Sequence, residues 1–230
     1  GVVCTAGFLS GSSGCIRSTS TLNGPLPIAA MSSFTFSRSE TTPDYRYFSL
    51  PNPEYYYRYS YGNADFFVVD SNKSLAPKSE QYQWLEGELA KSKATWKIAY
   101  HHHPAWSSDS DDYGDTKTQT NTKAGDLNAR NLVALYEKYK VDIVFNGHIH
   151  LYERTWPLKQ GKVERKEGVI YITSGGGGGR LEDFDPIPTW FKAQLRVDYH
   201  CCYANIHGNR LEFKAFDQNG NLFDSLDLSK

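Results

Sequence analysis

Five of the seven histidines in this 230-residue chain fall in two short runs. The first run is His101, His102 and His103, and the second is the pair His148 and His150 in Gly-His-Ile-His. Neutral imidazole is the commonest nitrogen ligand for zinc- and iron-type cations. Each run begins at or just after the carboxyl end of an expected strand, where ligands bind in open α/β sheets. The two runs therefore predict a shared metal site at one edge of a sheet.

The spacing of the second run leaves two arrangements open. An extended segment would place both imidazoles, at i and i+2, on one side of the chain. A bend, which Gly147 permits, would aim them at two neighbouring cations instead. An isolated histidine is more often a packed or surface residue. Two runs separated by one strand–helix unit favour the metal site over that interpretation.

Alternating strand and helix patterns supply the expected scaffold. Short apolar runs predict buried strands over 65–70, 96–101 and 141–146. One-sided apolar spacing predicts helices over 77–92 and 128–140. Strand and helix in this order imply right-handed crossovers and a largely parallel sheet.

The C-terminal part has a different pattern. Hairpin signals at 207–209 and 218–221 separate runs that are typical of strands. We expect an antiparallel arrangement of four strands, over 168–174, 194–206, 209–217 and 222–228. An aromatic stretch over 45–61 predicts a loop followed by a strand.

The N-terminal stretch has no clear period. Residues 1–40 are rich in Ser, Thr and Gly and predict a poorly ordered leader, so the domain is expected over 41–230. The start at Gly1 has no Met and no basic segment, which makes it a poor signal peptide and suggests a processed or truncated product. Cys4 and Cys15 are one conceivable disulfide pair.

Composition limits the partners that we expect. Hydrophobic residues make up 39% and charged residues 22%, which allows a packed core. The net charge of -1 gives no reason to expect a nucleic-acid surface, and no apolar run reaches membrane-spanning length. The sequence therefore predicts neither a nucleic-acid partner nor a membrane partner, and it leaves the oligomeric state open.

Two segments carry a resemblance to a known family. WKIAYHHHPAWSS (96–108) and VDIVFNGHIHLYERTWP (141–157) resemble the calcineurin-like metallophosphoesterases, purple acid phosphatases in particular. Those proteins have an H-x-P segment after one strand and a GHxHxYER segment after the next. The resemblance implies an α/β fold, a four-layered α/β/β/α sandwich. It also implies two metal ions (Fe, Zn or Mn), hydrolysis of small phosphate monoesters and a secreted or extracytoplasmic location.

The resemblance also implies roles for four residues. His102 and His148 correspond to ligands of one metal, and His150 corresponds to a ligand of the other. His103 corresponds to a catalytic position beside the metal, where it would contact the substrate or help to protonate the leaving group. Arg154 has two open roles, a phosphate contact through its planar guanidinium or a structural ion pair.

Three earlier family motifs, D-x-H, G-D-x-x-Y and G-N-H-[DE], are not recognisable here. The segments 62–65 and 198–200 match them only superficially. Without a bridging carboxylate two nearby cations repel strongly, whereas three histidines suffice for one cation. We therefore interpret the chain as a metallophosphoesterase domain whose N-terminal part is incomplete, with weak or no activity when isolated.

Three hypotheses follow from these motifs. The first is metal-dependent hydrolysis of phosphate monoesters. The second is a non-catalytic metal-binding remnant or structural module of the same fold. The third is a mononuclear three-histidine zinc hydrolase that acts on another substrate.

The glycines over 175–179 lack the Lys and Ser/Thr of a phosphate-binding loop and predict a flexible turn near the metal edge.

Overall fold

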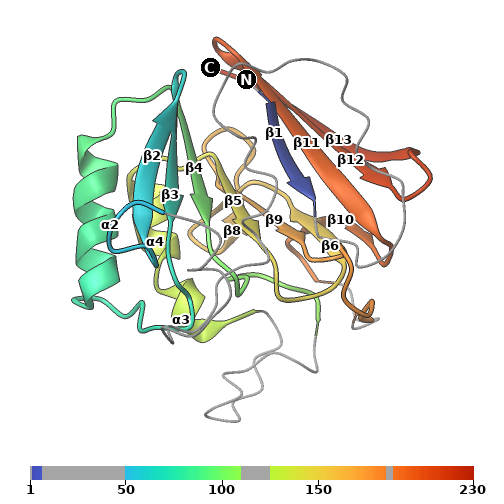
Figure 1. The fold of residues 1–230 in the computed structure, drawn as a ribbon, viewed down its shortest axis with the longest axis horizontal. Helices are drawn as coiled ribbons and strands as arrows, with labels where there is room; N and C mark the ends of the chain where they lie inside the picture. The colour runs from blue at the N-terminus through green and yellow to red at the C-terminus, as the bar shows by residue number, and fades with distance from the viewer. Residues whose placement is uncertain (1, 7–49, 110–124, 185–188) are drawn as a thin grey trace.

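A computed structural model describes residues 2–6, 50–109, 125–184 and 189–230. The described part is layered (Figure 1). A seven-stranded sheet has helices on one face and a four-stranded sheet on the other. These are three of the four layers expected from the family resemblance. Helices on the outer face of the four-stranded sheet are not among the described residues.

The seven-stranded sheet combines parallel and antiparallel strands. Its four central strands are mutually parallel, which confirms the parallel sheet predicted from the strand–helix alternation. The three flanking strands pair in the antiparallel sense. In spatial order the strands are β10 (Lys192–Arg196), β6 (Tyr152–Thr155), β9 (Ile170–Ser174), β5 (Ile143–Asn146), β4 (Trp96–Tyr100), β3 (Ala64–Val68) and β2 (Tyr57–Tyr61).

The helices follow the two predicted segments. Helix α2 (Glu80–Lys91) starts after Ser79, whose side chain accepts a hydrogen bond from the backbone N–H of Tyr82. The helix predicted over 128–140 is divided into α3 (Leu127–Arg130) and α4 (Val133–Lys138). Asn131 lies at the division, where its side-chain amide donates to the carbonyl of Asn128 and competes with the helical pattern.

Side chains alternate between the two faces of the central strands, and this divides the hydrophobic core into two clusters. One set of side chains faces the four-stranded sheet, and it includes Phe66, Ile98 and Phe145 packed with Phe213. The residues between them face the helices and pack against buried leucines of α2 and α4. Both faces of the parallel strands are therefore covered, as expected for a buried parallel sheet.

The four-stranded sheet is antiparallel. Its order is β1 (Val2–Ala6), β11 (His200–His207), β12 (Arg210–Asp217) and β13 (Leu222–Ser229). The predicted hairpins at 207–209 and 218–221 join these strands and are confirmed. Strand β1 falls within the predicted leader. The remaining leader, the first part of the 45–61 stretch and Cys15 lie outside the described residues, so the division at residue 40 stays a prediction.

Two expectations for the C-terminal part were wrong. The segment 168–174 does not join an antiparallel group of late strands, because β9 pairs in parallel with β5 in the central sheet. The single strand expected over 194–206 is two strands, β10 and β11, which belong to different sheets. A short apolar strand has the same residue pattern in either setting, so its partner decides the direction.

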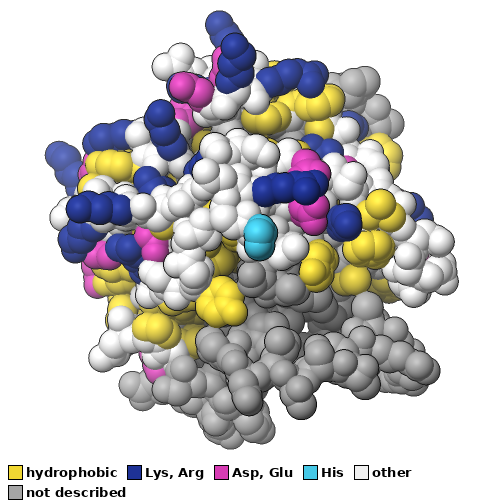
Figure 2. All heavy atoms as spheres, turned by 90° about the horizontal axis from the view of Figure 1, so that it is seen from above, with side chains coloured by type: hydrophobic (Ala, Val, Ile, Leu, Met, Phe, Trp, Pro, Cys, Tyr) yellow, Lys and Arg dark blue, Asp and Glu magenta, His cyan; other side chains and the backbone are white. Residues whose placement is uncertain are grey.

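The remaining described elements are minor. Strands β7 (Leu158–Lys159) and β8 (Lys162–Val163) form a small hairpin. On the face seen in Figure 2, basic and acidic side chains are interspersed, with scattered apolar side chains between them. Within the described ranges no helix is both long and apolar enough to cross a membrane.

Candidate metal centre

The carboxyl ends of β4 and β5 bring the two histidine runs together. The pairing of these strands continues past their ends, because His101 N–H donates to Phe145 O at 3.2 Å and Gly147 N–H donates to His102 O at 3.0 Å. The backbones that carry His102 and His148 are therefore fixed side by side. This is the edge at which open α/β sheets bind ligands.

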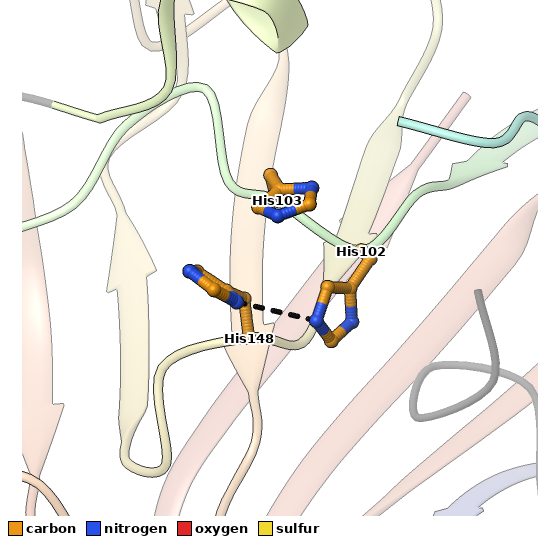
Figure 3. A group of neighbouring side chains, drawn as sticks. All are labelled: His102, His103 and His148. Carbon is orange, nitrogen blue, oxygen red and sulfur yellow. Dashed lines mark hydrogen bonds between the residues drawn. The ribbon is translucent and has the colours of Figure 1, made fainter. Parts of the chain in front are cut away.

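Three imidazoles face one another at this edge (Figure 3). His148 Nδ1 lies 3.2 Å from His102 Nε2. The ring of His103 is 4.9 Å from that of His102 and 4.4 Å from that of His148, measured between centroids. One nitrogen from each ring lies within 4.8 Å of the other two. We call His102, His103 and His148 the histidine cluster.

A left-handed backbone conformation orients His148. Its φ of 68° is unusual for a residue other than glycine, and such strain concentrates at functional sites. The bend that the sequence attributed to Gly147 is therefore at His148. It breaks the simple i, i+2 alternation, so that His148 and His150 face different surroundings.

His150 lies against the glycine-rich loop. Its Nδ1 is 2.8 Å from the carbonyl oxygen of Arg180 and 3.5 Å from Glu182 Oε1, and its backbone N–H donates to Glu182 Oε2 at 2.8 Å. The loop can approach because it lacks side chains. A Cβ at Gly175 would lie 2.0 Å from Ile149 O, and one at Gly179 would lie 2.6 Å from the His150 ring. The glycines therefore serve close packing.

Ser71, which follows β3, fixes the orientation of His103. Its Oγ accepts from the backbone N–H of His103 at 3.0 Å and lies 2.9 Å from His103 Nδ1. Sequence reasoning missed Ser71. Its position just past the end of a third parallel strand was the available signal, since the ends of neighbouring parallel strands meet at one edge.

Burial keeps two imidazoles at this edge neutral. It lowers the pKa of His148, with a smaller opposing effect from Glu182. Burial also lowers the pKa of His101 to about 4. His101 Nδ1 is 2.8 Å from the carbonyl oxygen of His103, and its ring stacks on Tyr136. His101 therefore packs against the backbone of His103 and the ring of Tyr136.

Comparisons with known proteins agree on one family. The family model described as calcineurin-like phosphoesterase matches residues 26–152, more than half of the chain. The chain belongs to the calcineurin-like phosphoesterase family. Its metallophosphoesterase fold is that of a solved purple acid phosphatase, PPD1 from yellow lupin seeds, with a TM-score of 0.70 and 28% identity. That match covers 80% of this chain and 34% of the lupin chain.

Curated relatives of this calcineurin-like chain include purple acid phosphatases of Arabidopsis thaliana. Probable inactive purple acid phosphatase 24 is 30% identical over 80% of this chain and 32% of its own length. Probable purple acid phosphatase 20 is 36% identical over 54% of this chain and 28% of its own length. The chain thus spans about a third of the length of the relatives it matches.

Arg154, one predicted substrate contact, is held by a carboxylate in this calcineurin-like fold. Its guanidinium donates from Nε and Nη2 to Asp224 at 2.6 and 2.8 Å, and its side chain is 12% exposed. Tyr152 also donates to Asp224, at 2.5 Å. The geometry therefore favours the structural ion pair over the phosphate contact, and the substrate role stays a prediction without support.

The histidine cluster fits one cation of the kind this family uses. Two imidazole nitrogens bound to one tetrahedral zinc at about 2.0–2.1 Å lie about 3.3 Å apart. The observed 3.2 Å between His148 Nδ1 and His102 Nε2 matches that spacing. Among the described residues no carboxylate joins the group. The cluster therefore offers nitrogen donors for one cation, and a second cation would need further ligands from outside the described residues.

Proposed function

We propose that this chain is part of a metal-dependent hydrolase of phosphate monoesters, in which His102 and His148 hold the cation. The observation that supports the proposal is the 3.2 Å approach of their ring nitrogens at the carboxyl ends of β4 and β5. Membership of the calcineurin-like phosphoesterase family supports the reaction class. The substrate would be a small phosphate ester, and an extracytoplasmic location remains an expectation from the family.

The chain's own residues would position the reaction. A bound Zn, Fe or Mn ion would polarise the phosphoryl group and lower the pKa of a bound water. His102 and His148 are oriented for this by the backbone contacts of β4 and β5, and burial keeps the His148 imidazole neutral. His150 remains the candidate ligand for a second ion. Its Nδ1 contact with Arg180 O leaves Nε2 as the ligating atom.

A second candidate function is a non-catalytic module that binds one cation. Two observations favour it. Several relatives carry "probable inactive" in their names, including purple acid phosphatases 24, 27 and 1 of Arabidopsis thaliana. In addition, no carboxylate from the described residues joins the histidine cluster. A site without its anionic ligands would keep a cation but lose much of the charge balance of a dinuclear centre.

Hydrolysis of p-nitrophenyl phosphate by the purified chain separates the two candidates. We expect hydrolysis that requires added Zn, Fe or Mn and that falls by more than about 100-fold in His148→Ala, since the loss of a ligand should exceed the 10–100-fold loss typical of an outer partner. His207→Ala, an exposed histidine at the end of β11, is the matched control and should retain activity. Metal binding without hydrolysis would establish the non-catalytic candidate instead.

A further inference from the structure

The ring of His103 has the position and surroundings of a ligand. It completes a group in which one nitrogen of each imidazole lies within 4.8 Å of the other two. Figure 3 shows the three rings converging from the segments after β4 and β5. The family resemblance implies a catalytic role for His103, yet its ring lies as close to its two neighbours as they lie to each other, with centroids 4.4–5.0 Å apart.

Ser71 restricts which nitrogen of His103 can bind a cation. Its Oγ is 2.9 Å from Nδ1 and also accepts from the His103 backbone N–H. An oxygen with two lone pairs can accept from both groups, in which case Nδ1 carries the proton and Nε2 keeps its lone pair. Metal-bound histidines almost always donate their other ring N–H in this way.

Ser71 is itself held rigidly. It is 4% exposed, and its carbonyl oxygen accepts from Asn128 Nδ2 at 3.1 Å. The preceding residue, Asp70, exchanges two hydrogen bonds with the side chain of Gln81 on α2, at 2.8 and 2.9 Å. A ring held by a fixed hydroxyl is pre-organised, which is what a ligand site needs.

We propose that His103 is the third ligand of a one-cation site with His102 and His148, and that Ser71 is its positioning residue. The proposal rests on the metal-dependent function proposed above and changes its ligand set, since His103 takes the place of a catalytic residue. Imidazole ligands suit zinc and similar first-row cations. Three protein ligands are also the number found in zinc sites that keep one position open for water.

His150 is the matched alternative. It lies two residues from His148 and belongs to the same motif, but its Nδ1 contacts Arg180 O and it is not part of the group. A site built from His102, His148 and His150 would require the glycine-rich loop to release that ring. The two ligand sets therefore make opposite predictions for His103 and His150.

Metal titration of the full chain tests the proposal. After removal of metal with a chelator, Zn²⁺ is titrated by calorimetry, and Co²⁺ is followed by its visible absorption, which reports the ligand set without any assay of activity. We expect one ion per chain. His103→Ala and His103→Phe, the second of which retains a packed ring, should weaken binding by more than about 100-fold and reduce the Co²⁺ bands.

Two further variants make the outcome decisive. Ser71→Ala should weaken binding by about 10–100-fold, and Ser71→Thr, which restores the hydroxyl, should recover it. His207→Ala, at the exposed end of β11, is the control and should stay within about 3-fold of the unchanged chain, because distant and independent sites have small effects on each other. Unchanged binding in folded His103→Phe, or equal losses in His150→Ala and His103→Ala, would overturn the proposal.

The titration is also independent of the proposed hydrolysis. If the chain binds one ion through His103 but hydrolyses nothing, the ligand assignment stands and the hydrolase proposal fails. If His148→Ala abolishes hydrolysis while both His103 variants bind metal normally, the hydrolase proposal stands and this ligand assignment fails.

Discussion

Two polar clusters of this molecule are built on opposite principles. Between the sheets, Arg154 and Asp224 form a bidentate ion pair that Tyr152 completes. At the strand ends, the histidine cluster brings like groups together, and no carboxylate from the described residues joins it. The first cluster satisfies its own charges and needs nothing further. The second offers three imidazoles and no anion from the described residues, which is the composition expected of the proposed cation site and not of a stabilising ion pair.

The pKa shifts of Arg154 and His148 also differ between the two clusters. Although burial alone would lower the pKa of the Arg154 guanidinium, the hydrogen bonds and charge of Asp224 raise it, so the guanidinium stays charged. At His148 burial dominates and lowers the pKa, which keeps the ring neutral and its lone pair available. We therefore expect changes in the first cluster to alter stability and changes in the second to alter metal affinity.

The largest expected effect is the loss of the ion pair. Asp224→Ala leaves the Arg154 guanidinium buried without a partner, and breaking a buried pair in this way costs about 3–5 kcal/mol of unfolding free energy. Urea denaturation measures the loss. Metal affinity of the folded fraction should not change, because Asp224 is not part of the histidine cluster.

Asp227→Ala provides the matched control for that variant. Asp227 pairs with Arg210 on the same sheet, but both side chains are more than half exposed, so solvent screens the interaction. Its effect on the unfolding free energy should be far smaller. Equal losses in the two variants would mean that the Arg154 pair is no more important than a surface pair, and the contrast between the clusters would fail.

The sequence predicted the scaffold of the site better than the contacts within it. Strands β3, β4 and β5 and helix α2 follow from local apolar patterns and were found within a few residues. Strand β6 was not predicted, because its polar residues Glu153 and Arg154 suggest solvent exposure. Both are satisfied by distant partners, Ser108 and Asp224, which no local pattern reveals.

The same limit applies to the candidate site. The two histidine runs and the sheet edge that joins them were visible in the sequence, and the structure places His102 beside His148. The separation of His150 from the cluster was not visible, because it depends on the positive φ of His148 and on the packing of the 175–179 loop. Backbone strain and loop packing are properties of the folded chain, not of residue spacing.

The next largest effect separates the backbone of His148 from its ring. Both His148→Ala and His148→Gly should lose metal binding, since neither has an imidazole. Glycine accepts a φ of 68° without strain. The free energy of unfolding of His148→Gly should therefore be about 1 kcal/mol higher than that of His148→Ala. The Ala and Gly variants of His150 are the control pair.

At His150 the order should reverse. The structure assigns no positive φ to that residue, so glycine brings only its greater conformational entropy in the unfolded chain. Urea denaturation of the four metal-free variants gives both differences. If His148→Gly were less stable than His148→Ala, the backbone at His148 would not be strained. Backbone strain would then no longer distinguish the histidine cluster from the Arg154–Asp224 ion pair.

The smallest effect is the pH dependence of stability that arises from His200, a buried histidine with hydrogen-bond contacts at both ring nitrogens. His200 Nδ1 lies 2.9 Å from Asp198 O and its Nε2 lies 3.0 Å from Ser174 Oγ. Burial lowers its pKa from the ordinary 6.5. The unfolded chain therefore binds a proton at a higher pH than the folded chain does. Stability from this residue is present above pH 6.5 and is lost as the pH falls through the folded pKa.

His200→Gln should flatten that pH dependence. Below pH 6.5 the unfolding free energy of the unchanged chain should fall more steeply than that of the variant, by at most about 1.4 kcal/mol per pH unit, the limit for one proton. Urea denaturation from pH 7.5 to 5, with zinc absent, measures the difference. Parallel curves would show that His200 is protonated as easily in the folded chain as in the unfolded one. The buried, hydrogen-bonded imidazole of His200 would then titrate like an exposed one, and burial alone would not explain the lowered pKa of His148.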